Sequence, residues 1–363
     1  MTIYATAALV ITIQRGVFAF PNDFAIFRAS FWNLLANSDL YVLRWDQARD
    51  YFKYSPSFAL LFAPFAVLPL IVGLFCWNLF NALAIFFALR LLLPREQWAV
   101  AQVLVFLPAL RSMQSAQSNA LVAALIILAF VSFERGWLWR GAMAVAFGTV
   151  IKIFPLAAIT FALPRPDRGR AMLKTVIAAA ILIALPLVVI SPSGLAAQYS
   201  SWNALERVES TLVGESAMRL LRDAGYRAPA WPVQLIAAAT VLFVLFLRFR
   251  DWNDRHLRLR FLGFLMLFCV VFNHRAERQS MVIAVCGLVI WYLASPRSAW
   301  HTVWFAIVYV LVVMTGSELF PDTLKQLLSA PERFSIPLTL SWLLMLGELT
   351  LTRAPRAAIA EAG

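Results

Sequence analysis

The chain has 363 residues, of which 62% are hydrophobic and 14% are charged, and its mean hydropathy is +0.76. Average soluble domains carry about a quarter charged residues, so this composition excludes a water-soluble globular protein and predicts an integral membrane protein. The net charge of +12 does not predict nucleic-acid binding, because the basic residues lie in short segments between apolar runs and not in one patch.

Many apolar runs follow one another along the chain and predict an all-α, polytopic helix bundle with about ten to twelve transmembrane helices. The runs lie near residues 2–20, 57–68, 70–93, 98–110, 119–133, 140–162, 171–192, 231–249, 259–272, 279–294, 299–315 and 335–352. Several are shorter than the ~20 residues of a full span. Prolines interrupt others, at Pro64, Pro69, Pro108 and Pro155. We therefore expect some kinked or half-depth helices.

The loops between the runs predict one transmembrane domain over residues 1–363 with a consistent orientation in its C-terminal half. Basic segments such as 163–174 and 250–258 are expected inside. The polar segments expected outside are 21–56, 193–230, 273–278 and 316–334. Between 57 and 162 the number of crossings stays open, because 134–140 and 163–174 both look cytoplasmic; the stretch around Lys152 to Pro155 is then a shallow hairpin.

Asp23 is the first candidate site residue, because it follows the first apolar run and opens the external segment 21–56. A carboxylate at a desolvated membrane boundary can act as a general base. The alternative is a helix N-cap, because Phe24, Phe27 and Phe31 follow it at helical spacing.

Lys53 and Tyr54 precede a proline-kinked apolar run. Lys53 can hold a phosphate oxygen while the neighbouring rings face a sugar or a lipid. Alternatively, both residues mark a helix end at the membrane interface, where lysine side chains snorkel and tyrosines gather.

The short external turn 273–278 contains His274, Arg275 and Glu277. His274 can steer a nucleophile or bind an anion together with Arg275, and Glu277 can orient either of them. The alternative is an ion-pair turn that neutralises itself. One histidine and one glutamate do not predict a metal site, and no other cluster has the spacing of metal ligands.

Polar residues also occur within or next to apolar runs. Gln117 and Asn119 begin one run, and Lys152 lies in another, where a lysine is costly unless it is paired or faces water. Hydrogen bonds between helices are the alternative role for the two amides. In the loop 193–230, Trp202 can stack on a sugar face or lie on the membrane surface, and an amphipathic helix follows it near Met218.

Taken in order, several short motifs resemble glycosyltransferase family 87, the polyprenyl-phosphate-mannose-dependent α-1,2-mannosyltransferase-like proteins, over about residues 20–350. The motifs are Asp23-Phe24, Asp39-Leu40-Tyr41, Tyr54-Ser55-Pro56, Gln117-Ser118-Asn119, Lys152-Ile153-Phe154-Pro155, Asn273-His274, Ala276-Glu277 and Glu318-Leu319-Phe320-Pro321. Two departures occur: the family usually has Gly where Ala116 precedes Gln117, and Arg278 and Gln279 stand where Ser and Pro are common.

The resemblance implies a GT-C fold in a bacterial inner membrane, with its active site at the extracytoplasmic face. It implies transfer of a sugar, mannose, from a polyprenyl phosphate to a hydroxyl of a lipid or glycan acceptor, with inversion and without a cofactor. Asp23 would be the general base and His274 the second catalytic residue. Substrate-binding residues would be Lys53, Tyr54, Gln117, Asn119, Lys152, Trp202, Arg275 and Glu277.

Two alternatives from other classes remain. A transporter or flippase of lipid-linked glycans predicts symmetric repeats and charges at mid-membrane, which the sequence does not show. An O-antigen ligase or polymerase predicts a larger external loop rich in arginine and histidine than 193–230 provides.

Overall fold

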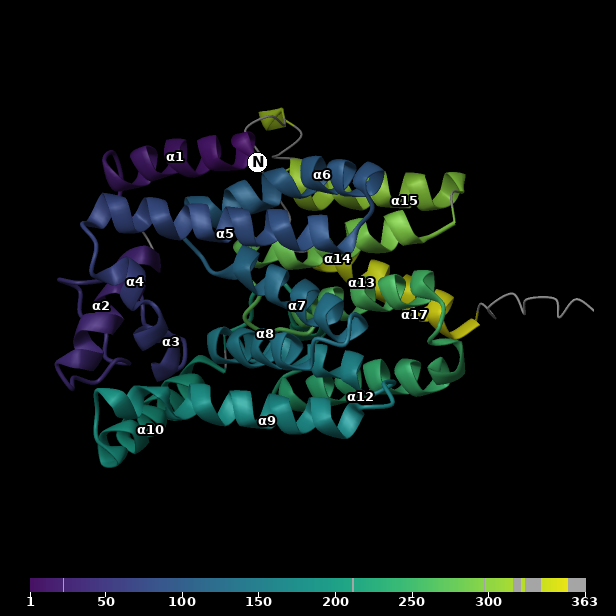
Figure 1. Cartoon of the computed structure of the whole chain (residues 1–363). Helices are drawn as coiled ribbons and strands as arrows, with labels where there is room; N and C mark the ends of the chain where they lie inside the picture. The colour runs from purple at the N-terminus through teal and green to yellow at the C-terminus, as the bar shows by residue number, and fades with distance from the viewer. Residues whose placement is uncertain (22, 211, 297, 316–320, 324–333, 352–363) are drawn as a thin grey trace, which may run out of the picture.

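The computed structural model describes residues 1–21, 23–210, 212–296, 298–315, 321–323 and 334–351. All regular structure in these residues is helical, as the apolar runs predict, and most long helices run alongside one another in a bundle (Figure 1). The predicted motif that begins at Glu318 and most of the loop 316–334 lie outside the described residues. The helices are α1 (Thr2–Gly16), α2 (Asp23–Leu35), α3 (Pro56–Leu61), α4 (Ala63–Ala66), α5 (Leu70–Leu92), α6 (Arg95–Gln114), α7 (Asn119–Glu134), α8 (Leu138–Ile151), η1 (Phe154–Ala162), α9 (Arg168–Ala184), η2 (Leu185–Val188), α10 (Pro192–Glu209), α11 (Ala217–Asp223), α12 (Trp231–Leu247), η3 (Phe249–Asp251), α13 (Arg255–Val271), η4 (Arg278–Ser280), α14 (Met281–Ala294), α15 (Ala299–Tyr309), η5 (Val310–Met314) and α17 (Ser335–Leu351).

Proline places several helix boundaries. Pro69 is the N-cap of α5, and Pro64 and Pro155 lie in the first turns of α4 and η1. Proline suits these positions because it has no backbone N–H to lose there. Pro108 behaves differently, since it lies inside α6, a helix of 20 residues that continues past it to Gln114. The apolar run near 98–110 is therefore the middle of a longer helix than its hydropathy indicates.

The apolar helices are mostly short. Among the described residues, Leu70–Leu92 and Arg168–Val188 are long and apolar enough to cross a membrane by length and composition, and six further apolar helices have 10–17 residues. On α9, Leu173, Val176 and Ile181 are 60%, 63% and 56% exposed. Continuous exposed apolar faces of this kind are typical of surfaces that contact lipid or a partner, not water.

Four arginines lie together at one end of the bundle, called here the arginine end. Arg135 and Arg255 donate hydrogen bonds of 3.1 and 2.7 Å to the carbonyls of Leu91 and Leu92, at the end of α5. Arg165 donates to the carbonyl of Phe133, and Arg258 pairs with Glu134 at 2.6 Å. Segments 134–140 and 163–168 thus lie at the same end, and α8 and η1 form the predicted hairpin between them.

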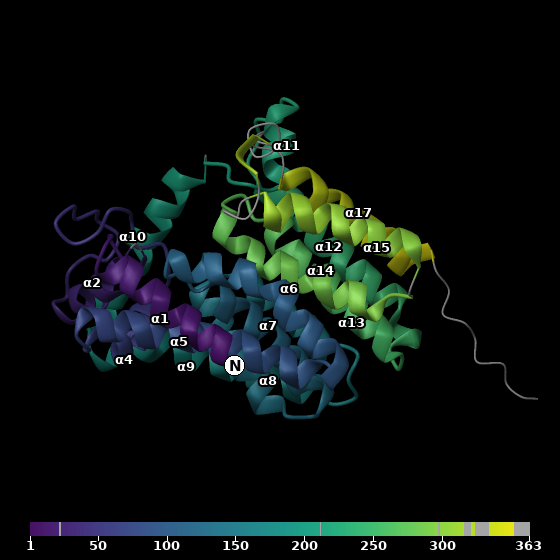
Figure 2. The ribbon, with the colours of Figure 1, turned by 90° about the horizontal axis from the view of Figure 1, so that it is seen from above.

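The opposite end, called here the cavity end, collects the turns that carry the predicted motifs. Ser55, the N-cap of α3, donates a 2.6 Å hydrogen bond to the Val150 carbonyl at the end of α8. The Asp23 backbone N–H donates to the Ser115 carbonyl after α6 at 3.4 Å. Helices α2, α3, α4 and α10 cover this end, whereas the chain leaves α17 at the other (Figure 1; Figure 2 shows the view turned by 90°).

Close packing of α13 against α14 fixes the turn 273–278 between them. Gly263 and Gly287 face each other, and a Cβ on either would lie 2.6–2.7 Å from the other's carbonyl oxygen. Gly214, after α10, is also required, because a Cβ there would lie 2.2 Å from the Ala276 oxygen. The neighbouring backbone N–H groups of Gly214 and Glu215 donate to the carbonyls of His274 and Ala276 at 2.7 and 2.6 Å. The turn is therefore held from both sides.

Candidate active site

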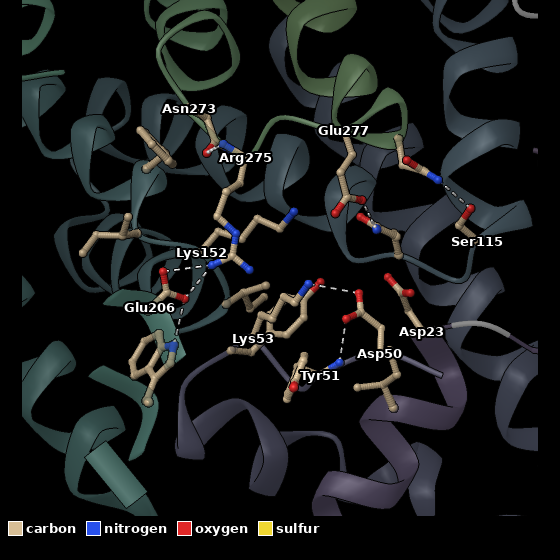
Figure 3. Close-up of a pocket in the computed structure, with 18 of the residues that line it drawn as sticks. Asp23, Asp50, Tyr51, Lys53, Ser115, Lys152, Glu206, Asn273, Arg275 and Glu277 are labelled. Carbon is tan, nitrogen blue, oxygen red and sulfur yellow. Dashed lines mark hydrogen bonds and ion pairs between the residues drawn. The ribbon is translucent and has the colours of Figure 1, made fainter. Parts of the chain in front are cut away.

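A cavity of about 530 Å³ opens at the cavity end. Every residue singled out from the sequence as a site residue lines it, except Asn119, which lines a smaller adjoining cavity together with Lys152. The predicted residues that line this cavity are Asp23, Lys53, Tyr54, Gln117, Lys152, Trp202, His274, Arg275 and Glu277. Segments far apart in sequence thus bring the predicted residues together around one space (Figure 3).

Asp23 is the first residue of α2, and the buried rings of Phe24, Phe27 and Phe31 hold this helix in the core. Among the described residues, no side chain or backbone group forms a hydrogen bond or ion pair with its carboxylate, so the first turn of α2 supplies no evidence for the capping role. Burial, and then the negative charge of Glu277, raise the pKa of Asp23 to about 7. A carboxyl group with this pKa can accept a proton near neutral pH.

Four predicted residues form one chain of hydrogen bonds. Lys152 Nζ donates to Asn119 Oδ1 at 2.7 Å, Asn119 Nδ2 donates to Gln117 Oε1, and Gln117 Nε2 donates to Glu277 Oε2 at 2.7 Å. Hydrogen bonding by the two amides, one of the alternatives considered for them, is confirmed. Glu277 forms no hydrogen bond or ion pair with His274 or Arg275, so the expectation that it orients one of them is wrong.

The turn before α7 places Gln117 and Asn119. The N–H groups of Ala116 and Gln117 donate to the carbonyls of Met113 and Ser112 at 2.8 and 3.0 Å, which is a Schellman ending of α6. Ala116 has a φ of 54°, in the left-handed region that favours glycine. Glycine would adopt this backbone conformation without strain.

Arg275 and Lys53 are both held by carboxylates of α10. Arg275 donates to both oxygens of Glu206 at 2.9 Å and to Glu209 at 2.5 Å. Lys53 Nζ lies 3.1 Å from Glu209 and 3.0 Å from Asp50. Burial lowers the pKa of Lys53, but its bonds to these two carboxylates outweigh burial and raise the pKa. The turn 273–278 therefore does not neutralise itself, because Arg275 pairs with Glu206 and Glu209 of α10.

His274 presents one ring nitrogen that has no hydrogen-bond partner among the described residues. Gln234 Nε2 donates to the Phe272 carbonyl at 3.0 Å and lies 3.3 Å from His274 Nδ1, which must then accept. The proton is thereby assigned to Nε2, which is buried and makes no hydrogen bond within the described part of the chain. Burial and the charge of Arg275 lower the pKa of His274. A neutral ring with a free N–H donor therefore lines the cavity.

Aromatic rings form another part of the wall. Trp202 Nε1 donates to Glu206 at 3.2 Å, and its ring lies parallel to that of Tyr41 with 6.3 Å between centroids. Tyr54 is buried, with its ring 4.9 Å from that of Phe27. The amphipathic helix predicted after Trp202 is α11, in which Met218 is buried.

Several residues of the site are not among those predicted from the sequence. Glu206 and Glu209 could have been found, since they continue the helical face of Trp202 on α10. Asp50 and Arg49, by contrast, lie in an irregular segment with no periodic pattern. Arg49 lines the cavity and lies over the ring of Phe20, 4.5 Å from its centroid.

A helical bundle with exposed apolar faces and a cavity lined by acids and bases is typical of a membrane enzyme that acts on a charged substrate. The chain belongs to glycosyltransferase family 87, whose model matches residues 52–272. Comparison with curated proteins finds no match. The protein is therefore a glycosyltransferase, which implies a sugar donor and an acceptor, and the family and the apolar helices together indicate a membrane protein. Asp23 and the turn 273–278 lie outside the matched residues.

Proposed function

We propose that the protein transfers mannose from a polyprenyl-phosphate donor to a hydroxyl of a lipid or glycan acceptor, with inversion at the anomeric carbon. One observation carries this proposal: the same cavity holds an acid that has no partner among the described residues, Asp23, and a wall of hydrogen-bond donors. Figure 3 shows Asp23 and Arg275 on different sides of the pocket. An inverting displacement needs a base and a leaving-group site on opposite sides of the sugar carbon.

In the proposed reaction, Asp23 accepts the proton of the acceptor hydroxyl. At the same time, the oxygen of that hydroxyl forms a bond to the anomeric carbon. The bond from that carbon to the phosphate oxygen breaks, and the phosphate leaves with the electron pair. Negative charge therefore grows on the phosphate as the bond breaks. Arg275, Lys53 and the Nε2–H of His274 would stabilise this charge, which is the largest that develops.

The carboxylates around Arg275 and Lys53 give these cations fixed positions before the donor binds. Glu209 is 7% exposed and contacts both, so the two cations lie on either side of one buried anion. Donors held in place by a second set of bonds lose little freedom when a substrate binds. The remaining lining residues Gln117, Lys152 and Trp202 would contact the sugar and the acceptor.

We further propose a GT-C-type, multi-pass protein of the bacterial inner membrane, with the cavity end outside. The arginine end supports this orientation, since basic residues are enriched in cytoplasmic loops. Apolar residues of the cavity wall, Phe20, Ile26, Ile153 and Phe154, suit the first isoprene units of a lipid donor.

A transfer assay tests the proposal. Purified protein in lipid nanodiscs receives radiolabelled mannose on polyprenyl phosphate or, in a parallel sample, on a nucleotide, together with a membrane-lipid extract. We expect label to reach a new product only from the polyprenyl donor, with an anomeric configuration opposite to that of the donor. Transfer from the nucleotide donor alone, or retention of configuration, would contradict the proposal.

A further inference from the structure

The chain from Lys152 to Glu277 has a direction that its two ends determine. A lysine ammonium can only donate, and a carboxylate can only accept. The amide oxygen of Asn119 must therefore face Lys152, and the amide nitrogen of Gln117 must face Glu277. Asn119 and Gln117 are 0% and 7% exposed, so water does not compete freely for these bonds.

Glu277 is fixed from a second side as the N-cap of η4. Its side chain accepts from the Ser280 backbone, and its own N–H donates to Ser280 Oγ at 3.4 Å. Nearby, Gln279 Nε2 donates to Ser115 Oγ at 3.0 Å, while the carbonyl of Ser115 accepts from the Asp23 N–H. The backbone of Asp23 and the η4 turn that Glu277 caps thus both bond to Ser115, and Asp23 and Glu277 line the same cavity.

We propose that Glu277 is a positioning residue of the transfer reaction: the amide chain that begins at Lys152 fixes its carboxylate in the cavity that Asp23 also lines, where it favours transfer of the acceptor proton to Asp23. The inference rests on the proposed role of Asp23. Glu277 itself gains and loses no proton in the reaction. The acceptor proton goes to Asp23, and Glu277 favours the protonated product of that step over its ionised form.

The two amides between Lys152 and Glu277 matter for this effect. A direct ion pair would place a positive charge next to Glu277 and cancel most of its field at Asp23. The amides hold Glu277 through neutral groups and keep the ammonium farther away. In agreement, Glu277 is the charged group with the largest influence on the pKa of Asp23, and it outweighs Lys152.

The charged groups that face Asp23 come from three elements. Glu277 lies in the turn before η4, Lys152 follows α8, and Asp50 and Lys53 belong to the segment before α3. Glu277 and Asp50 raise the pKa of Asp23, whereas Lys152 and Lys53 lower it. Removing the charge of Glu277 should therefore lower the pKa of Asp23, and removing the charge of Lys152 should raise it.

Infrared titration of the purified protein in nanodiscs measures this without a substrate. The carboxyl signal of Asp23 is obtained as the difference between each protein and the same protein carrying Asp23→Asn. We expect Glu277→Gln to lower the titration midpoint by on the order of one pH unit and Lys152→Gln to raise it. Glutamine at 277 can still accept from Gln117 and differs mainly in charge. Glu215→Gln, at an acid outside the cavity lining that pairs with Arg278, should leave the midpoint unchanged.

The transfer assay then reports whether the charge is used. With Glu277→Gln, the acidic limb of the pH–rate profile should move to lower pH by the same amount as the infrared midpoint, with a lower rate on the plateau. If the infrared titration midpoint of Asp23 is the same in wild type, Glu277→Gln and Lys152→Gln, the inference is overturned, even if Asp23 proves essential for transfer. If the midpoint shifts as expected but Asp23→Asn still transfers mannose, the assignment of Asp23 as base fails instead.

Discussion

The two ends of the bundle use arginine in different ways. At the arginine end, Arg135, Arg165 and Arg255 donate to backbone carbonyls at or near the ends of helices. At the cavity end, the described bonds of the Arg275 guanidinium go only to side-chain carboxylates. The last carbonyls of a helix need hydrogen-bond donors in any fold, so the arginines at the arginine end have a structural role. A helix bundle does not need clustered carboxylates around a cavity for its stability.

The comparison shows that charge alone does not locate the functional end. Basic residues are abundant at both ends, and an apolar chain needs them at one end simply to set its orientation. What distinguishes the cavity end is a carboxylate without a described partner, a histidine N–H without one, and enough space for a sugar. These features raise the free energy of the folded protein and are typical of an active site.

A matched pair of arginine variants tests whether arginine has a different role at each end of the bundle. The side chains of Arg275 and Arg258 are equally accessible, 19% and 20% exposed, and each pairs with glutamate. We expect Arg275→Gln to slow transfer by about 100-fold, because it removes a cation from the leaving phosphate. Arg258→Gln should leave the rate within about threefold and lower thermal stability by about 2 kcal/mol. Transfer rates and unfolding curves of both variants, in the same nanodiscs, decide between the two roles. Equal rate losses would mean that both arginines act only through the fold.

The pH dependence of transfer sharpens the account of the cavity end. Asp23 must be ionised to accept a proton, and its pKa is raised to about 7. The rate should therefore rise about tenfold between pH 6 and pH 8 and then level off. A rate that is flat over this range, measured with saturating donor, would contradict the raised pKa of the base.

The same raised pKa has a consequence for stability. Ionised Asp23 is less favourable in the folded protein than in the unfolded chain, so its contribution to stability is fully present below its unfolded pKa and is lost as the pH rises through about 7. At pH 8, Asp23→Asn should therefore be at least as stable as wild type, as thermal unfolding would show. A lost activity in this variant would then not arise from unfolding.

The smallest expected effect concerns the turn that places Gln117. Ala116 has a left-handed φ that glycine adopts without the clash of a Cβ. Since glycine also costs more conformational entropy, Ala116→Gly should stabilise the protein by only about 0.5 kcal/mol. Unfolding curves should show this gain with the transfer rate unchanged. A loss of stability would mean that the buried Ala116 methyl matters more than its backbone.

Much of the fold could be predicted from sequence because lipid-facing and buried helices are both apolar. The runs near 119–133 and 231–249 correspond to α7 and α12 within a few residues. The continuation of α6 through Pro108 could not be predicted, since a proline in an apolar run usually ends or kinks a helix. The hairpin around Lys152 was predicted from the basic residues on both sides of it.

The cavity lining was largely predictable because polar residues are costly in an apolar chain. Asp23, Lys152 and Asn119 stand out against such a background. Their partners could not be predicted, because pairing depends on which turns meet in space. Glu277 bonds to Gln117, 160 residues earlier in the chain, and Arg275 bonds to Glu206, 69 residues earlier.

The most direct test of the central claim compares Asp23→Asn with Asp46→Asn in the transfer assay with polyprenyl-phosphate-mannose. Both residues belong to the segment 21–56, but Asp46 is exposed and does not line the cavity. The account predicts that Asp23→Asn loses transfer by about 1,000-fold or more, while Asp46→Asn transfers like wild type. If the Asp23→Asn protein transfers mannose as fast as wild type, Asp23 is not the base, and the proposed mechanism is wrong.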